Sequence, residues 1–130
     1  MSDFKKLKIW QIAHQLTLKM YGLTKKLPRE EIFGLISQTR RAAISVESNI
    51  AEGESRYTNR DKINFFVQAR SSASELQTQL ILITDLYPVL SESSTKLENE
   101  YEILSKQINS LINFRRKITN EKNKIENTKT

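Results

Sequence analysis

Apolar residues recur along the chain at steps of three and four, the spacing that places side chains on one face of an α-helix. Four such stretches occur, over about residues 4–26, 30–54, 58–87 and 96–118. Strict alternation, which would indicate strands, is absent from them. The pattern therefore predicts four helices, each with an apolar stripe for a shared core. The predicted core positions are Ile9, Ile12, Leu16, Met20, Leu23 and Leu27; Phe33, Ile36, Ala43, Val46 and Ile50; Ile63, Phe66, Ala69, Ala73, Leu76, Leu80, Ile83 and Tyr87; and Leu97, Tyr101, Leu104, Ile108, Leu111 and Ile118.

Helix boundaries are indicated by residues with special backbone chemistry. Pro28 interrupts the first stretch, and Pro88 disfavours helical geometry at the preceding residue. Gly53 is a candidate C-terminal cap for the second helix. Thr58 or Asn59 is a suitable N-cap for the third, since a short polar side chain accepts from a free backbone N–H.

Four long helices with short connections pack most simply as an antiparallel up-down-up-down four-helix bundle. We therefore predict an all-α fold with one domain over residues 1–120. Residues 121–130 lack an apolar period and predict a polar, disordered C-terminal tail. A two-helix hairpin completed by a partner is disfavoured, because all four segments carry their own stripe.

Composition narrows the class of protein. The 130 residues suit a single domain, and there are no cysteines, which excludes disulfides and thiolate chemistry. No stretch predicts a signal peptide or a membrane span, so a cytoplasmic location without membrane partners is expected. The net charge is +6, with seven basic and two acidic residues in 1–30 and eight basic and six acidic in 91–130. A basic excess at both ends permits nucleic-acid binding without establishing it.

Candidate catalytic and metal-binding residues are few. His14 is the only histidine, and no second ligand stands at helical spacing from it, so a surface or boundary position is expected. The three glycines are isolated and form no phosphate loop. Glu47, Glu52 and Glu54 are interpreted as solvated helix-flank acids. The sequence thus predicts a non-enzymatic protein with no metal, no cofactor and no small-molecule substrate.

One polar constellation stands out on the second helix. Its members share a face at steps of three, four, four and three, roughly opposite the apolar stripe. They are Gln38, Arg41, Ser45, Asn49 and Glu52. Pairing of the second and third helices would bring Gln38 and Arg41 near Ser72 and Glu75, and we hypothesise an Arg41–Glu75 ion pair. The alternative for this face is a solvated surface.

The same residues carry a family resemblance. The run from Gln38 to Gly53, with Arg41-Ala42, Ser45, Asn-Ile-Ala-Glu-Gly at 49–53 and then Arg56, resembles the signature of four-helix-bundle proteins encoded in intervening sequences of bacterial 23S rRNA genes. Residues 69–80 are similar to the family's second block, and residues 4–10 to its N-terminal pattern. The resemblance covers about residues 4–118. Ser71 departs from it, because the family usually has glycine there.

The resemblance implies up-down four-helix bundles, some of which assemble as homopentamers. A related branch is the accessory protein of diversity-generating retroelements, a pentameric barrel that partners a reverse transcriptase and nucleic acid. The rRNA-associated branch has no established activity. A homo-oligomer, with a pentamer favoured, is therefore expected, and the polar face including Gly53 and Glu75 is a candidate interface.

Two functions follow as hypotheses. The first is a non-enzymatic RNA- or DNA-binding assembly, whose basic groups gather at one end of the bundle. The candidate contacts are Lys5, Lys6, Lys8, Arg56, Arg60, Arg115, Arg116 and Lys117. No known reading motif appears, so binding should be non-specific and sensitive to salt. The second is an interaction scaffold or accessory subunit whose partner is a protein, steered by the same charge.

Overall fold

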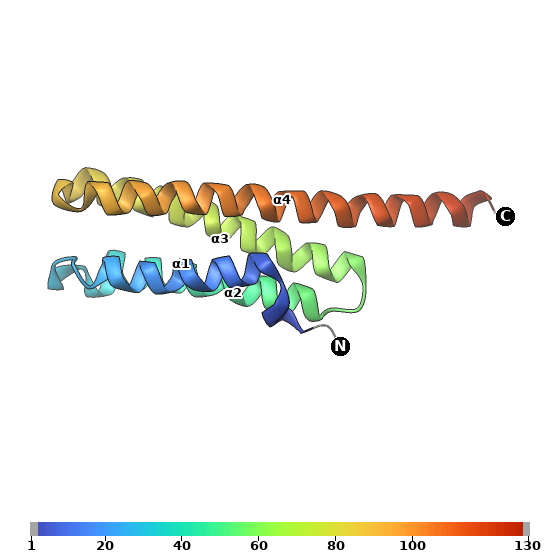
Figure 1. Ribbon diagram of the computed structural model, residues 1–130, viewed down its shortest axis with the longest axis horizontal. Coiled ribbons are helices and arrows are strands. Elements are labelled where there is room, and N and C mark those ends of the chain that lie inside the picture. Colours follow the sequence, from blue (N-terminus) through green and yellow to red (C-terminus); the bar gives the residue numbers. More distant parts are fainter. Residues whose placement is uncertain (1–2, 129–130) are drawn as a thin grey trace.

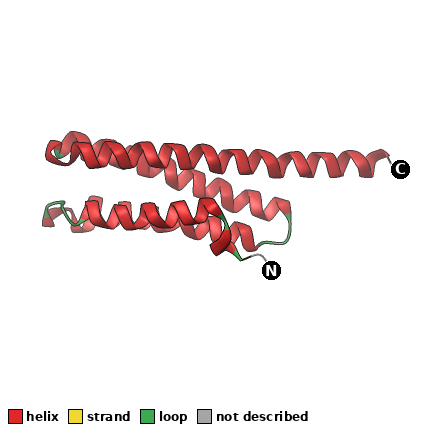
Figure 2. Ribbon diagram, viewed as in Figure 1, coloured by secondary structure: helices red, strands yellow, loops and turns green. Residues whose placement is uncertain are grey.

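The computed structural model describes residues 3–128, which form helices joined by short loops (Figure 2). No strand occurs among these residues, so the predicted all-α class with four long helices is confirmed. The long helices are α1 (Lys8–Thr24), α2 (Ser37–Ser55), α3 (Asn59–Leu86) and α4 (Ser91–Thr128). The short elements are the 3-10 helices η1 (Phe4–Lys6), η2 (Arg29–Glu31) and η4 (Pro88–Leu90) and the π-helical segment η3 (Ile32–Ile36).

The helices pack as one elongated body (Figure 1). Each long helix contacts the next along the chain, and α1 also contacts α4. The α1–α2 and α3–α4 connections lie at one end of the body, which we call the far end. The α2–α3 turn lies at the other, which we call the rim end, together with the start of α1. There α4 passes the turn and continues beyond it (Figure 1).

The core is formed by the predicted stripes, which meet between the four helices. Tyr101, Phe66, Leu16 and Met20 are among its largest fully buried side chains. The hydroxyl of Tyr101 is buried without a hydrogen-bond partner among the described residues. Burial is the main reason that the pKa of Tyr101 lies well above its usual value.

The second helix begins later than its apolar period predicts. The stretch from residue 30 is not one helix, because the backbone leaves helical geometry at Gly34, with φ −106° and ψ −111°. The break turns Phe33 outward, where it is 93% exposed, while Leu35 is buried. The prediction of Phe33 as a core residue is therefore wrong. Continuing a 3.6-residue period through a backbone break assigns the side chains before it to the wrong face.

Two of the predicted boundaries are confirmed and one is wrong. The Thr58 side chain accepts a hydrogen bond from the Asp61 backbone N–H at 3.1 Å, capping α3. Helix α3 ends at Leu86, before the residue that precedes Pro88. Gly53 is not a C-cap, because α2 continues to Ser55 and no described glycine has a positive φ. Gly53 is instead buried against Phe66.

The C-terminal segment also differs from its prediction. Residues 121–128 continue α4 as helix, where the sequence predicts a disordered tail. None of them is buried, so tertiary packing does not support these turns. Lys and Glu are good helix formers, and local propensity accounts for the continuation. The last two residues of the predicted tail, 129 and 130, lie outside the described residues.

Candidate nucleic-acid interface

The rim end gathers basic side chains from three parts of the chain. Lys5, Lys6 and Lys8 are exposed at the start, in and just after η1. The Asp3 carboxylate accepts from the Lys5 backbone N–H, and Gln11 donates to the Lys5 carbonyl at 2.9 Å, which fixes this segment against α1. The α2–α3 turn and the passing α4 supply the other predicted basic residues.

Arg56, in the turn, is already engaged. Its guanidinium lies 3.1 Å from the Glu52 carboxylate and 4.6 Å from the centre of the Phe65 ring. These contacts orient the side chain and offset part of its charge. Arg56 remains exposed, but it offers a nucleic acid less net charge than the sequence implies.

Two adjoining hollows lie between the α2–α3 turn and α4, and we call them together the rim groove. They share Arg60 and Thr119 and have volumes of about 300 and 420 Å³. The first is lined by Arg60, Ile63, Asn64, Arg116, Thr119 and Asn120, and the second by Tyr57, Thr58, Asn59, Arg60, Thr119, Lys122, Asn123 and Glu126. The fold thus brings Arg60 and Arg116, from different helices, into one hollow.

Arg115 has a mainly structural position. It is half-buried, and Nη1 donates to Asn59 Oδ1 at 3.3 Å, which joins α4 to the start of α3. Its Nε is buried and has no hydrogen-bond partner among the described residues. Lys117 is exposed but lines neither hollow of the rim groove. Of the eight predicted contacts, only Arg60 and Arg116 therefore line the groove itself.

Lys62 is a basic residue that the sequence reasoning missed. Its Nζ donates to the Glu54 carbonyl at 2.8 Å and to the Gly53 carbonyl at 3.5 Å, so it caps the end of α2 from α3. Burial lowers the pKa of Lys62, Glu54 partly opposes this, and the positive charge of Arg115 adds to it. A lysine one turn into a helix gives no sequence signal for this role, which depends on the packing of α3 against α2.

The predicted polar face of α2 lies beside α3, as its spacing indicates. Ser45 Oγ lies 2.9 Å from Ser72 Oγ, and Asn49 Nδ2 donates to the Ser45 carbonyl at 2.8 Å. Arg41 and Glu75 border one hollow of about 310 Å³. No ion pair joins these two residues in the structure, so that hypothesis is wrong. Glu75 instead accepts a hydrogen bond from Gln79 at 3.3 Å, an interaction within α3.

His14 occupies a boundary position between α1 and α2, as predicted. Its Nδ1 lies 3.0 Å from Glu47 Oε2, and its ring stacks on Trp10 at 5.1 Å between centroids. Trp10 in turn contacts Phe4 edge-on. The contacts with Glu47 and Trp10 explain the orientation of His14 as a result of helix packing. Among residues 3–128 no group of three or more His, Cys, Asp or Glu side chains is arranged to hold a metal ion.

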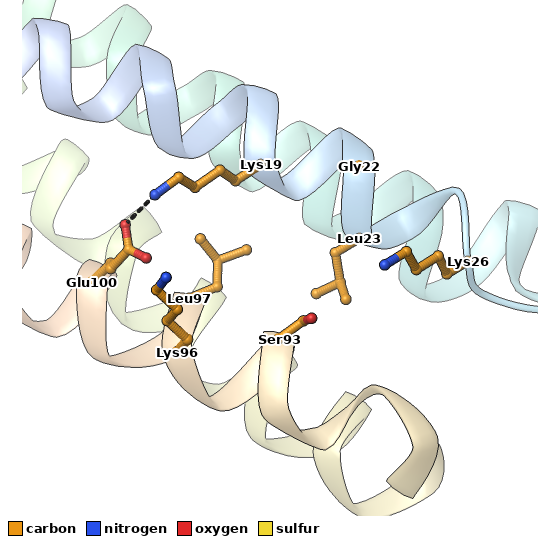
Figure 3. A pocket seen from close by; sticks show the side chains of 8 residues that line it. All are labelled: Lys19, Gly22, Leu23, Lys26, Ser93, Lys96, Leu97 and Glu100. Carbon is orange, nitrogen blue, oxygen red and sulfur yellow. Dashed lines mark hydrogen bonds and ion pairs between the residues drawn. The ribbon is translucent and has the colours of Figure 1, made fainter.

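A second basic hollow, which the sequence reasoning also missed, lies between α1 and α4 toward the far end (Figure 3). Leu23 and Leu97 lie between the helices, and Lys19, Lys26 and Lys96 surround them. Lys19 is paired with Glu100 at 2.9 Å, so two lysines face this hollow without a paired acid. The hollow measures about 310 Å³. It provides a smaller basic surface at the opposite end of the molecule from the rim groove.

Within residues 3–128 no helix combines the length and the apolar character that a membrane span requires. The described residues thus define a protein built only from helices, with basic hollows at its two ends.

The chain belongs to the 23S rRNA-intervening sequence protein family, whose model matches residues 5–110. No curated protein matches the sequence. The match spans α1, α2, α3 and about the first half of α4. The α4 side of the rim groove, from Arg116 onward, follows the matched residues.

Proposed function

We propose that this chain is a non-enzymatic RNA-binding protein that uses the rim groove as its contact surface. The observation that carries the proposal is the pairing of Arg60 and Arg116 in one hollow by helices far apart in the sequence. Two guanidinium groups at one site suit the phosphates of a nucleic-acid backbone. Lys122 extends the same charge along α4. Family membership supports a link to ribosomal RNA genes, and RNA is the ligand we favour over DNA.

A mobility-shift series across salt concentrations tests this function. We expect binding at about 50 mM salt that weakens steeply as salt rises, because bound cations release counterions from the phosphates. The double variant Arg60→Ala/Arg116→Ala should bind more weakly and reduce the slope of log K against log salt by about one per arginine. The control is Lys26→Ala/Lys96→Ala, which removes the same charge at the far end. Absence of binding at low salt, or equal losses in both variants, would rule out the rim groove as the contact surface.

We further propose that the functional unit is a homopentamer of antiparallel up-down-up-down bundles. The hollow of Gln38, Arg41, Ser45, Ser72 and Glu75 supports it, because this polar groove on the α2–α3 surface holds exposed hydrogen-bonding groups without the predicted ion pair. Polar groups at an interface fix its geometry when a partner satisfies them. A ring of subunits would also multiply the rim groove around one axis and strengthen binding by avidity.

Light scattering tests the assembly. A pentamer has five times the 15.1 kDa mass of the chain. Arg41→Ala/Glu75→Ala should lower that mass, whereas Lys106→Ala, at an exposed position on α4, should not. A monomeric mass for the unaltered protein at micromolar concentration would contradict the proposal.

A protein-binding scaffold, with no direct contact to nucleic acid, is the alternative function. The observation that favours it is apolar exposure away from the groove: Phe33 is 93% exposed and Val89 is 92% exposed. Exposed large apolar side chains mark protein contact sites when they cluster. Retention of one defined protein partner after nuclease treatment, together with no RNA binding, would favour this function over the first.

A further inference from the structure

Tyr57 is exposed in the rim groove without a structural role. It lies between the end of α2 and the start of α3, and its side chain is 92% exposed. Within residues 3–128 it makes no side-chain hydrogen bond and no ring contact. Because the ring is exposed to water, it adds no buried apolar area to the core, and packing does not account for an aromatic residue at this position.

The neighbours of Tyr57 give the groove a chemistry that suits nucleotides. Arg60 and Lys122 line the same hollow and can bind phosphates. Asn64, Asn120 and Asn123 add amides, which both donate and accept hydrogen bonds, as base edges do. In the sequence Tyr57 lies between Arg56 and Arg60, which places it near basic residues of the turn but not near those of the fourth helix. Only the fold also places this ring in one hollow with Lys122 of α4.

We propose that the rim groove binds single-stranded RNA, with one base stacked on Tyr57 and the backbone held by Arg60, Arg116 and Lys122. This inference rests on the proposed function and names its substrate class. Stacking on a protein side chain requires a base that is free of its own stack. Paired bases in an RNA duplex present no open face to Tyr57, so a duplex would engage the arginines alone.

The arrangement of the two hollows also indicates where successive nucleotides of a bound strand would lie. Arg60 lines both hollows and therefore stands where they meet. A phosphate on Arg60 would place one nucleotide toward Tyr57 and the next toward Arg116 and Asn64. The two hollows have room for a short stretch of strand, which is consistent with the small site sizes of single-strand binders.

The hollow between α1 and α4 differs in this respect. Its lining contains three lysines but no aromatic side chain (Figure 3). It can attract phosphates, yet it offers no surface for stacking. We therefore expect discrimination between single and double strands to arise at the rim groove.

Fluorescence polarisation with two labelled RNAs tests the proposal. The probes are an unstructured uridine strand of about 20 nucleotides and a fully paired RNA duplex of the same length. Tyr57→Ala should weaken binding of the single strand at least about fivefold, the lower range for loss of one stacking contact, and leave duplex binding unchanged. Tyr57→Phe should bind within about twofold of the unaltered protein, because the ring rather than the hydroxyl stacks.

Phe33→Ala is the matched control, because it removes an equally exposed aromatic ring in η3, which belongs to the α1–α2 connection. A second readout uses Tyr57→Trp, whose fluorescence should be quenched by the uridine strand beyond any change from Trp10 in the unaltered protein. Equal affinities of Tyr57→Ala and Phe33→Ala for the single strand would overturn the inference, as would tighter binding of the duplex. If Arg60→Ala/Arg116→Ala still weakens RNA binding when Tyr57→Ala does not, the proposed function survives. If the unaltered protein binds neither RNA, the proposed function fails first.

Discussion

Gly53 shows how one residue fixes the approach of two helices. A Cβ atom at this position would lie 2.6 Å from Phe66 Cε1 and 3.2 Å from the Lys62 carbonyl oxygen. Phe66 is fully buried, so its ring has no free space into which it can move. From the sequence, Gly53 belongs to a family motif and is interpreted as a helix C-cap, because glycine suits that position. The structure gives it a different role, which is close helix packing. Only the packing of α3 distinguishes close approach from capping.

Gly53→Ala should therefore destabilise the fold. Overpacking costs about 1–3 kcal/mol, which outweighs the gain in helix propensity of up to about 1 kcal/mol. Urea denaturation monitored by circular dichroism measures the change in free energy of unfolding. The matched control is Gly22→Ala in α1, where an added Cβ has no neighbour within 4 Å. That variant should be more stable by about 0.5–1 kcal/mol, and equal effects of the two substitutions would contradict this account.

At the scale of elements, Lys62 links the end of α2 to the first turns of α3. Its amine donates to the last carbonyls of α2, while its pKa is lowered mainly by burial. The lowered pKa means that the unfolded chain binds this proton more tightly than the folded chain. The free energy of unfolding therefore rises with pH across the interval just below the ordinary lysine pKa of 10.5.

Lys62→Met should remove this rise. Between about pH 8 and pH 10 the free energy of unfolding should increase more for the unaltered protein than for Lys62→Met. Urea denaturation at both values of pH measures it. Lys117→Met, at an exposed lysine on α4, is the control. A difference that stays constant with pH, or moves the other way, would show that burial does not perturb Lys62.

The N-terminal part of the second predicted helix shows that apolar periodicity does not predict a break in the helical backbone. The apolar steps continue through Gly34, but the backbone does not remain helical there. By contrast, the start of α3 at its Thr58 cap follows from side-chain chemistry close in sequence. Local hydrogen bonding is predictable because both partners lie within one turn. A break inside an apolar run depends on how the flanking segments pack.

At the scale of the whole molecule, α4 extends beyond the α2–α3 turn (Figure 1). We expect this extension to contribute to RNA binding but not to the stability of the fold. Residues 121–128 include no buried side chain, but Lys122 and Asn123 line the rim groove. Removing residues 121–130 should leave the melting temperature unchanged within about 2 °C, because the core stays intact. It should weaken single-stranded RNA binding, because a phosphate contact and part of the groove are lost.

Thermal melts and the polarisation assay measure the two effects on the same preparation. Lys122→Ala alone should reproduce part of the loss of affinity. A large drop in melting temperature on truncation would show that the last turns of α4 take part in packing, for instance within an assembly. Unchanged RNA affinity would place the contact surface elsewhere.

The sequence by itself determined the helices, most of the core and the family. Apolar stripes at helical spacing indicate which residues face inward, because each helix buries its apolar face in the shared core. Thr58 and Pro88 act within a turn of their own positions. The sequence likewise indicated that the polar face of α2 meets α3, which the Ser45–Ser72 contact bears out.

The tertiary structure alone decided which basic residues share a site. Net charge and position along the chain placed eight candidates at one end, but they did not separate the paired Arg56 and the half-buried Arg115 from Arg60 and Arg116. Nor did they bring Tyr57 into the groove or assign Lys62 to the end of α2. The pairing of Arg56 with Glu52 is local, within one helical turn, but the other roles depend on distances between different helices. Such distances are set by how the four helices pack together, which no local pattern of residues encodes.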